Sequence, residues 1–172
     1  RYDPGDRFVC AIPDATVLGP VGPGVTADGR VIVDTVGTPP LGSRRTGVTL
    51  ANSIRANGVR QTLNSLSTKR AATPDRHFKI ATLAIPPWSN YYHWTMECLP
   101  RIRLLERYGE TTGQYPTLLI PSDPPGWIEE SISLIDYSGD IVRFTGTVAT
   151  VETLVVPTFP DPTPTECTWL RS

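Results

Sequence analysis

Residues 79–108 decide the fold and read KIATLAIPPWSNYYHWTMECLPRIRLLERY. The first part, 79–85, is an apolar run that ends at Pro86 and Pro87, which predicts a buried β-strand. Residues 90–108 then place apolar side chains three or four positions apart, which predicts an amphipathic helix. A buried strand followed by a helix is the unit from which α/β proteins with a parallel sheet are built.

The same alternation continues downstream. Residues 117–120 and 141–144 are predicted strands, residues 126–137 between them are a predicted helix, and a strand at 153–156 completes the pattern. Ligands of parallel sheets bind beyond the carboxyl ends of the strands. We therefore expect the functional site near the loop at 86–90.

The N-terminal part, residues 1–40, has a different character. It contains short β-prone runs, at 7–12, 15–18 and 31–36, together with an Asp28-Gly29 turn signal. Glycine accepts the positive φ that a tight turn requires, so this pair predicts an antiparallel hairpin. We expect a small antiparallel β piece that precedes the α/β part.

A basic segment follows at residues 41–78, which we expect to be a linker with some helix. Residues 41–80 hold eight Lys or Arg against one acidic residue, Asp75, although the whole chain has a net charge of −1. Two interpretations stay open, a solvated face or a surface that attracts an anionic partner such as a sugar phosphate, a lipid head group or an acidic polysaccharide. The near-zero total charge argues against nucleic-acid binding.

Length and cysteine usage limit the class further. A chain of 172 residues can bury one ordinary core. Cys10, Cys98 and Cys167 are widely spaced and accompanied by only two histidines, which indicates neither a zinc module nor a disulfide scaffold and suits a reducing compartment. No apolar run approaches the roughly 20 residues of a membrane-spanning helix. We expect a cytoplasmic protein without a metal.

The predicted helix at 90–108 carries two sets of side chains. Ser89 or Asn90 is a suitable N-cap, and Pro100 predicts a kink because proline has no amide hydrogen. One apolar stripe, expected to pack on the sheet, consists of Tyr91, Trp94, Cys98, Ile102 and Leu105. The adjoining face presents His93, Glu97 and Arg101 at intervals of four.

This second set permits acid–base chemistry. A carboxylate one turn from an imidazole orients the ring and stabilises its protonated form, so His93 is a candidate base with Glu97 as its partner, or Glu97 is itself the base. The alternative is a structural histidine and an ordinary Glu97–Arg101 pair. Trp88 and the tyrosines beside it suit either sugar stacking or core packing.

The run Asn90-Tyr91-Tyr92-His93-Trp94, followed by Glu97 and by Leu99-Pro100-Arg101-Ile102, resembles the hallmark segment of glycosyltransferase family 61. Its bacterial and archaeal members are often described as capsular polysaccharide biosynthesis proteins. The resemblance implies a GT-B enzyme with two Rossmann-like halves. It also implies inverting, metal-independent sugar transfer from a nucleotide sugar to a glycan, without a cofactor.

By this resemblance, residues 79–168 are the Rossmann-like, acceptor-side domain of the N-terminal half. Residues 169–172 would begin the linker to a C-terminal half that holds the nucleotide sugar. The implied catalytic residues are His93 and Glu97, and the implied substrate-binding residues are Asn90, Tyr92, Trp88 and Arg101.

Three functions stay open at this point. The first is a hexosyl- or pentosyltransferase acting on a cell-surface polysaccharide, of which this half alone would be inactive. It would work in the cytoplasm, with peripheral contact to the membrane left open. The second is a non-catalytic carbohydrate- or anion-binding module, and the third is a subunit of a split transferase. His77 receives no role in any of them.

Overall fold

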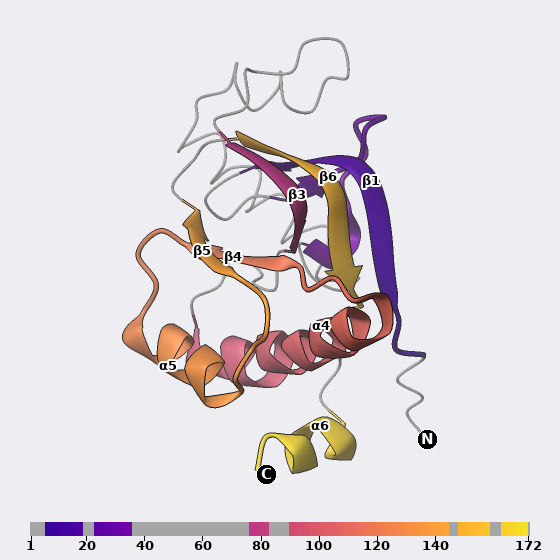
Figure 1. Cartoon of the computed structure of the whole chain (residues 1–172). Helices are drawn as coiled ribbons and strands as arrows, with labels where there is room; N and C mark the ends of the chain where they lie inside the picture. Colours follow the sequence, from indigo (N-terminus) through magenta and orange to yellow (C-terminus); the bar gives the residue numbers. More distant parts are fainter. Residues whose placement is uncertain are drawn as a thin grey trace.

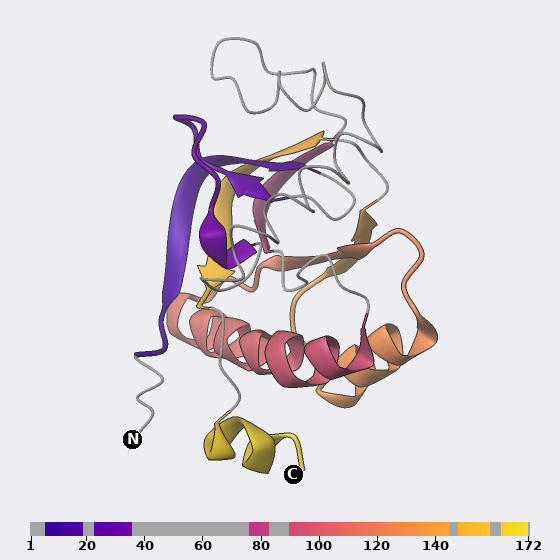
Figure 2. The same cartoon turned by 180° about the vertical axis from the view of Figure 1, so that it is seen from behind.

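The computed structural model describes residues 6–18, 23–35, 76–82, 90–144, 148–158 and 163–171. These residues form an α/β fold with a mixed six-stranded sheet in the order β2-β1-β6-β3-β4-β5. The helices α4 and α5 lie along one side of this sheet (Figure 1), as the reverse view also shows (Figure 2). The predicted α/β class is therefore confirmed.

The elements follow the chain in this order. The strands are β1 (Val9–Leu18), β2 (Gly24–Val25), β3 (Arg76–Thr82), β4 (Thr117–Pro121), β5 (Ile141–Phe144) and β6 (Val148–Pro157). The helices are the 3-10 turn η1 (Val33–Thr35), α3 (Tyr91–His93), the π-helical turn η2 (Trp94–Cys98), α4 (Leu99–Thr112), α5 (Gly126–Leu134) and α6 (Pro164–Trp169).

Four neighbouring strands, β6, β3, β4 and β5, run parallel, as predicted for this part of the chain. The N-terminal strands differ in direction but belong to the same sheet. β1 pairs antiparallel with β6 along its whole length, from Val9 opposite Pro157 to Leu18 opposite Val148. The antiparallel piece is thus one edge of the sheet that also contains the α/β strands.

The Asp28-Gly29 turn is confirmed. Gly29 has a φ of 84°, and an antiparallel bridge joins Val25 to Val31 across the turn. The expected strand at 31–36 is wrong, because residues 33–35 form a 3-10 turn instead. Of the basic segment, residues 41–75 lie outside the described part of the chain, and so do residues 83–89, which include the end of the strand predicted at 79–85.

The sheet curls, and this departs from the predicted alternation of strands and helices. Only residues 145–147 separate β5 from β6, whereas parallel strands usually need a connection of a dozen residues or more. Figure 1 shows β5 pointing toward the start of β6. The rings of Phe78 in β3 and Phe144 in β5 are in edge-to-face contact, with their centroids 6.4 Å apart, although β4 lies between these strands. The curl explains how so short a connection suffices.

The core between the sheet and the helices comes from the predicted apolar positions. It contains Trp94, Cys98, Ile102 and Leu105 of the long helix, together with Leu118, Ile120, Ile128, Ile132 and Val155. Four of the five residues of the predicted stripe are therefore buried. The fifth, Tyr91, is 65% exposed. It is the first residue of its helix and contacts Trp127 of α5 instead of a strand.

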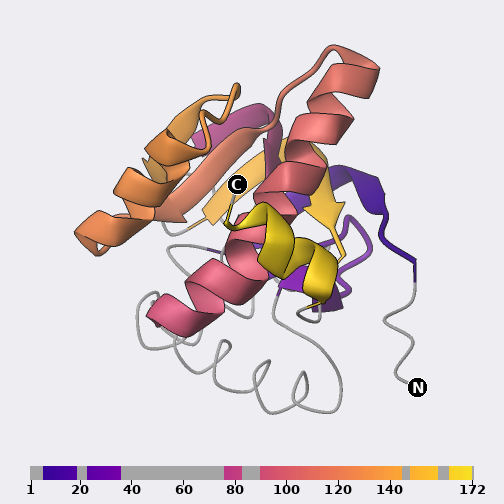
Figure 3. The same ribbon diagram turned by 90° about the horizontal axis from the view of Figure 1, so that it is seen from below.

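Helix α6 lies across α4 on the side that faces away from the sheet (Figure 3). Its end, Trp169 and Leu170, packs against the helical side of the core. A shallow groove of about 450 Å³ separates α6 from the end of α5 and is lined by Leu99, Ser131, Leu134, Ile135, Trp169 and Leu170. None of the helices in the described ranges is long and apolar enough to cross a bilayer.

Candidate functional site

One helix, residues 91–112, carries most of the predicted site. It starts at Asn90, whose side-chain Oδ1 accepts a hydrogen bond of 2.9 Å from the Tyr92 amide, so the predicted N-cap is confirmed for Asn90. The helix ends at Gly113, which has a φ of 71° and serves as the C-cap. In the chain it follows β3, as α5 follows β4, and both helices therefore begin after the carboxyl ends of neighbouring parallel strands.

Pro100 gives this helix its local shape. Without an amide hydrogen it cannot bond the carbonyl of Met96, and its ring crowds that carbonyl. The amide of Leu99 instead donates to the carbonyl of Trp94, five residues earlier, which makes residues 94–98 a π-helical turn. Where the sequence predicts a kink at Pro100, the structure has a π-helical turn directly before this residue. Such turns occur often at functional sites.

His93 and Glu97 meet across this turn. His93 Nδ1 lies 2.9 Å from Glu97 Oε1, and their side chains are 29% and 11% exposed. Nδ1 is buried and makes no aligned hydrogen bond in the described part of the chain, so the contact is a close approach of the two side chains. Catalytic hydrogen bonds are often poorly aligned before substrate binds.

The second oxygen of Glu97 also lacks a hydrogen-bond partner among the described residues. This atom, Oε2, is buried. A buried carboxylate oxygen without a partner is costly, and such groups are rare in native proteins. This cost would be relieved by a water molecule or by a ligand hydroxyl.

Arg101, one turn beyond Glu97, lies inside the protein. Its side chain is 0% exposed, and Nη2 donates to the carbonyls of Asp34 and Pro157, at 2.9 and 2.7 Å. Burial lowers the pKa of the guanidinium, and the nearby Cys98, Asp34 and Glu97 oppose that shift. Arg101 therefore joins the helix to η1 and to the end of β6, and we do not count it among the groups proposed to contact substrate.

The thiol of Cys98 is not a candidate nucleophile. It is fully buried in the core. Burial raises its pKa strongly, with Arg101 opposing the shift and Glu97 adding to it. A thiol in such surroundings stays protonated and unreactive.

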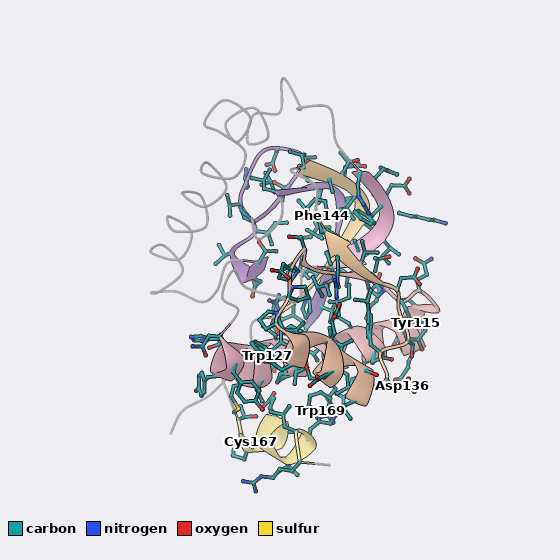
Figure 4. The ribbon with its side chains drawn as sticks, turned by 90° about the vertical axis from the view of Figure 1, so that its left-hand side faces the viewer. Tyr115, Trp127, Asp136, Phe144, Cys167 and Trp169 are labelled. Atoms are coloured by element: carbon teal, nitrogen blue, oxygen red, sulfur yellow. The ribbon has the colours of Figure 1, made fainter. Side chains whose placement is uncertain are left out.

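Aromatic rings surround the start of the helix. The exposed ring of Tyr92 lies edge-on to His93, with centroids 5.5 Å apart, and Tyr91 has the same kind of contact with Trp127 at 5.5 Å. Figure 4 labels Trp127 near the start of α5, beside the helix that carries His93. The predicted site residue Trp88 lies outside the described residues. The sequence did not indicate Trp127 as a site residue, because it lies in α5, which follows β4 and not β3.

The second histidine, His77, also lies next to a glutamate. In β3 its Nε2 is 3.0 Å from Glu152 Oε1 and its Nδ1 is 3.0 Å from Thr150 Oγ1, both on the neighbouring strand β6. Nothing in the sequence indicates this pairing across 75 residues. His77 and Glu152 are exposed, at 59% and 55% of their side chains, so water screens their interaction. The half-buried His93–Glu97 pair is the better candidate for chemistry.

Within the described ranges, no group of three or more His, Cys, Asp or Glu side chains is placed to hold a metal ion. Comparison of the chain with known protein families, curated proteins and solved structures finds no match. The site therefore has to be interpreted from its own geometry and from the motif.

Proposed function

We propose that this chain is the acceptor-binding half of a family-61 type glycosyltransferase with the GT-B architecture. In this proposal it transfers a sugar from a nucleotide sugar to a cell-surface polysaccharide or a related glycan, on the cytoplasmic side of the membrane. The observation that carries the proposal is the contact of 2.9 Å between His93 and Glu97 at the start of a helix that follows a parallel strand. The Asn-Tyr-Tyr-His-Trp motif at residues 90–94 supports it.

The pair would act as base and partner. Nδ1 of His93 faces Glu97 and is buried, so Nε2 is the ring nitrogen that would take up a proton. When Nδ1 carries the ring proton, the carboxylate holds this tautomer and stabilises the imidazolium that forms.

The proposed step is a direct displacement. The acceptor hydroxyl oxygen forms a bond to the anomeric carbon of the donor sugar while its proton passes to His93 Nε2. The bond between that carbon and the phosphate oxygen breaks, and the nucleotide leaves with the electron pair. Attack from the face opposite the nucleotide inverts the anomeric configuration, and no metal ion is needed for the proton transfer itself.

The substrate-binding roles of Asn90 and Tyr92 are part of the proposal. Both side chains are exposed beside His93 at the start of the helix. Asn90 already uses Oδ1 to cap the helix, so its side-chain amide NH₂ is the group that would reach a sugar hydroxyl. Tyr92 would contact the sugar that carries the reacting hydroxyl.

A transfer assay tests this function. The chain, combined with the donor-binding half that the proposal requires, is incubated with a panel of nucleotide sugars and glycan acceptors, and products are followed by mass spectrometry. We expect one acceptor to gain the mass of a single hexose or pentose in the presence of EDTA. Glycan binding without transfer from any donor would contradict the proposal and favour a non-catalytic carbohydrate-binding module.

A further inference from the structure

Two aromatic residues from different helices meet beside the proposed site. Tyr91 is the first residue of α3, and Trp127 is the second residue of α5. Their ring centroids lie 5.5 Å apart with the planes at 82°, so the two rings form a corner with nearly perpendicular walls. Most of the Tyr91 side chain is open to solvent, which makes this corner accessible.

A second corner lies next to the first. The rings of Tyr92 and His93 are 5.5 Å apart with the planes at 78°. Tyr91 and Tyr92 are consecutive residues, so the two corners share one turn of helix. One of them contains the proposed base.

Trp127 is held firmly in its position. Its ring centroid lies 6.3 Å from that of Trp94. The indole N–H of Trp94 donates a hydrogen bond of 2.7 Å to Ser131 Oγ. Ser131 in turn donates to the carbonyl of Ile128, so α5 is fixed against the helix that carries the site. A ring that is already fixed loses little conformational entropy when a ligand binds to it.

We propose that Tyr91 and Trp127 form a second saccharide subsite, so that the acceptor is an oligosaccharide of at least two sugars. The sugar with the reacting hydroxyl lies at Tyr92 and His93, and the preceding sugar lies in the corner of Tyr91 and Trp127. This inference rests on the proposed function, because it takes the ligand of this edge to be a glycan.

A sugar fits this corner better than a purely apolar ligand does. One face of a pyranose carries C–H groups that pack on an aromatic ring, while its hydroxyls require polar neighbours. The corner offers an aromatic surface together with the phenol O–H of Tyr91, and the polar residue that precedes Tyr91 in the chain, Asn90, is exposed. A fatty acyl chain would leave those polar groups without partners.

Binding without donor tests the subsite separately from catalysis. Dissociation constants of the full chain are measured by calorimetry for glucose-, galactose-, mannose- and N-acetylglucosamine-based tetrasaccharides and for the matching monosaccharides. We expect at least one tetrasaccharide to bind at least tenfold more tightly than its monosaccharide. Tyr91→Ala and Trp127→Leu should remove this advantage, and the exposed position of Tyr91 means that its replacement should leave the fold intact.

Leu134→Ala is the matched control, since Leu134 is the last residue of the helix that holds Trp127, about two turns further along, and is 86% exposed. It should bind as the wild type does. The subsite is refuted if no tetrasaccharide binds, if tetrasaccharides bind no better than monosaccharides, or if Tyr91→Ala leaves the advantage intact. Loss of sugar transfer in His93→Ala would still support the transferase even where the subsite fails.

Discussion

Arg101 donates a hydrogen bond of 2.7 Å from Nη2 to the carbonyl oxygen of Pro157, the last residue of β6. The same nitrogen donates to the carbonyl of Asp34 at 2.9 Å. One buried guanidinium thus joins the helix that carries His93 to two segments that are far away in the sequence. Removing a charged group from water costs free energy. The hydrogen bonds of Arg101 to the two carbonyls help to offset this cost.

Replacing Arg101 should therefore destabilise the whole fold. Arg101→Met removes the donor from the buried carbonyl of Pro157 and the partly buried carbonyl of Asp34. We expect this to lower the free energy of unfolding by about 3 kcal/mol. Urea unfolding measures the change. The control is Arg103→Met on the same helix, because Arg103 lies partly exposed over the ring of Trp169 at 5.6 Å. Equal losses in the two variants would contradict the role given to Arg101.

Tyr137 should make the free energy of unfolding fall at alkaline pH. It donates a hydrogen bond from its hydroxyl to the carbonyl of Pro116. Burial raises its pKa above the usual value, and the charges of Glu106 and Asp140 add to the shift. A tyrosine in the unfolded chain ionises near pH 10. The stability that this group contributes is therefore present below about pH 10 and is lost as the pH rises further.

Tyr137→Phe should lower the free energy of unfolding by about 1 kcal/mol at pH 8 and flatten its decline above pH 10. Urea unfolding at pH 8, 10 and 11 checks both effects. Tyr91→Phe, at an exposed position, should follow the wild-type curve. An equally steep alkaline decline in Tyr137→Phe and in the wild type would refute this account.

Pro100 follows the π-helical turn that holds Glu97 near His93, the pair proposed to be catalytic. Pro100→Ala restores an amide hydrogen that can bond the carbonyl of Met96, so the π-turn at 94–98 should relax toward an α-helix. His93 would then be rotated about the helix axis relative to α4. We expect kcat of transfer to fall at least tenfold, whereas the free energy of unfolding should change by less than about 1.5 kcal/mol, because the regained hydrogen bond offsets lost packing.

The matched control is Pro164→Ala, at the exposed first position of α6, which should leave kcat unchanged. Circular dichroism should show that both variants keep their helices. Wild-type kcat in Pro100→Ala would show that the π-turn has no part in the site.

Local chemistry made much of the fold predictable. The strand at 141–144 was predicted with its observed bounds, since apolar residues there are flanked by turn signals. Asn90 was a predictable cap and Pro100 a predictable disturbance, because both effects depend on one residue and its own helix. Helix ends were less certain, as α5 ends at Leu134 and not at residue 137.

Features that depend on contacts between distant segments were not predictable. The curl of the sheet places Phe78 against Phe144, and no periodicity in the sequence encodes that contact. The contact between Tyr91 and Trp127 was not predictable either. The apolar spacing predicts that every turn of the helix faces the sheet, and this is why Tyr91 was expected in the core. The burial of Arg101 was also missed, since its partners are backbone carbonyls of other segments.

The chain offers an internal comparison for its central claim, because its two histidines each lie within 3.0 Å of a glutamate, in different surroundings. The most direct measurement is kcat of sugar transfer, with the donor-binding half present, for His93→Ala and His77→Ala under the same conditions, with Glu97→Gln as a third variant. We predict that kcat falls at least a hundredfold in His93→Ala and at least tenfold in Glu97→Gln, and stays within twofold of wild type in His77→Ala. Unchanged kcat in His93→Ala, or an equal loss in the two histidine variants, would contradict the assignment of His93 as the base.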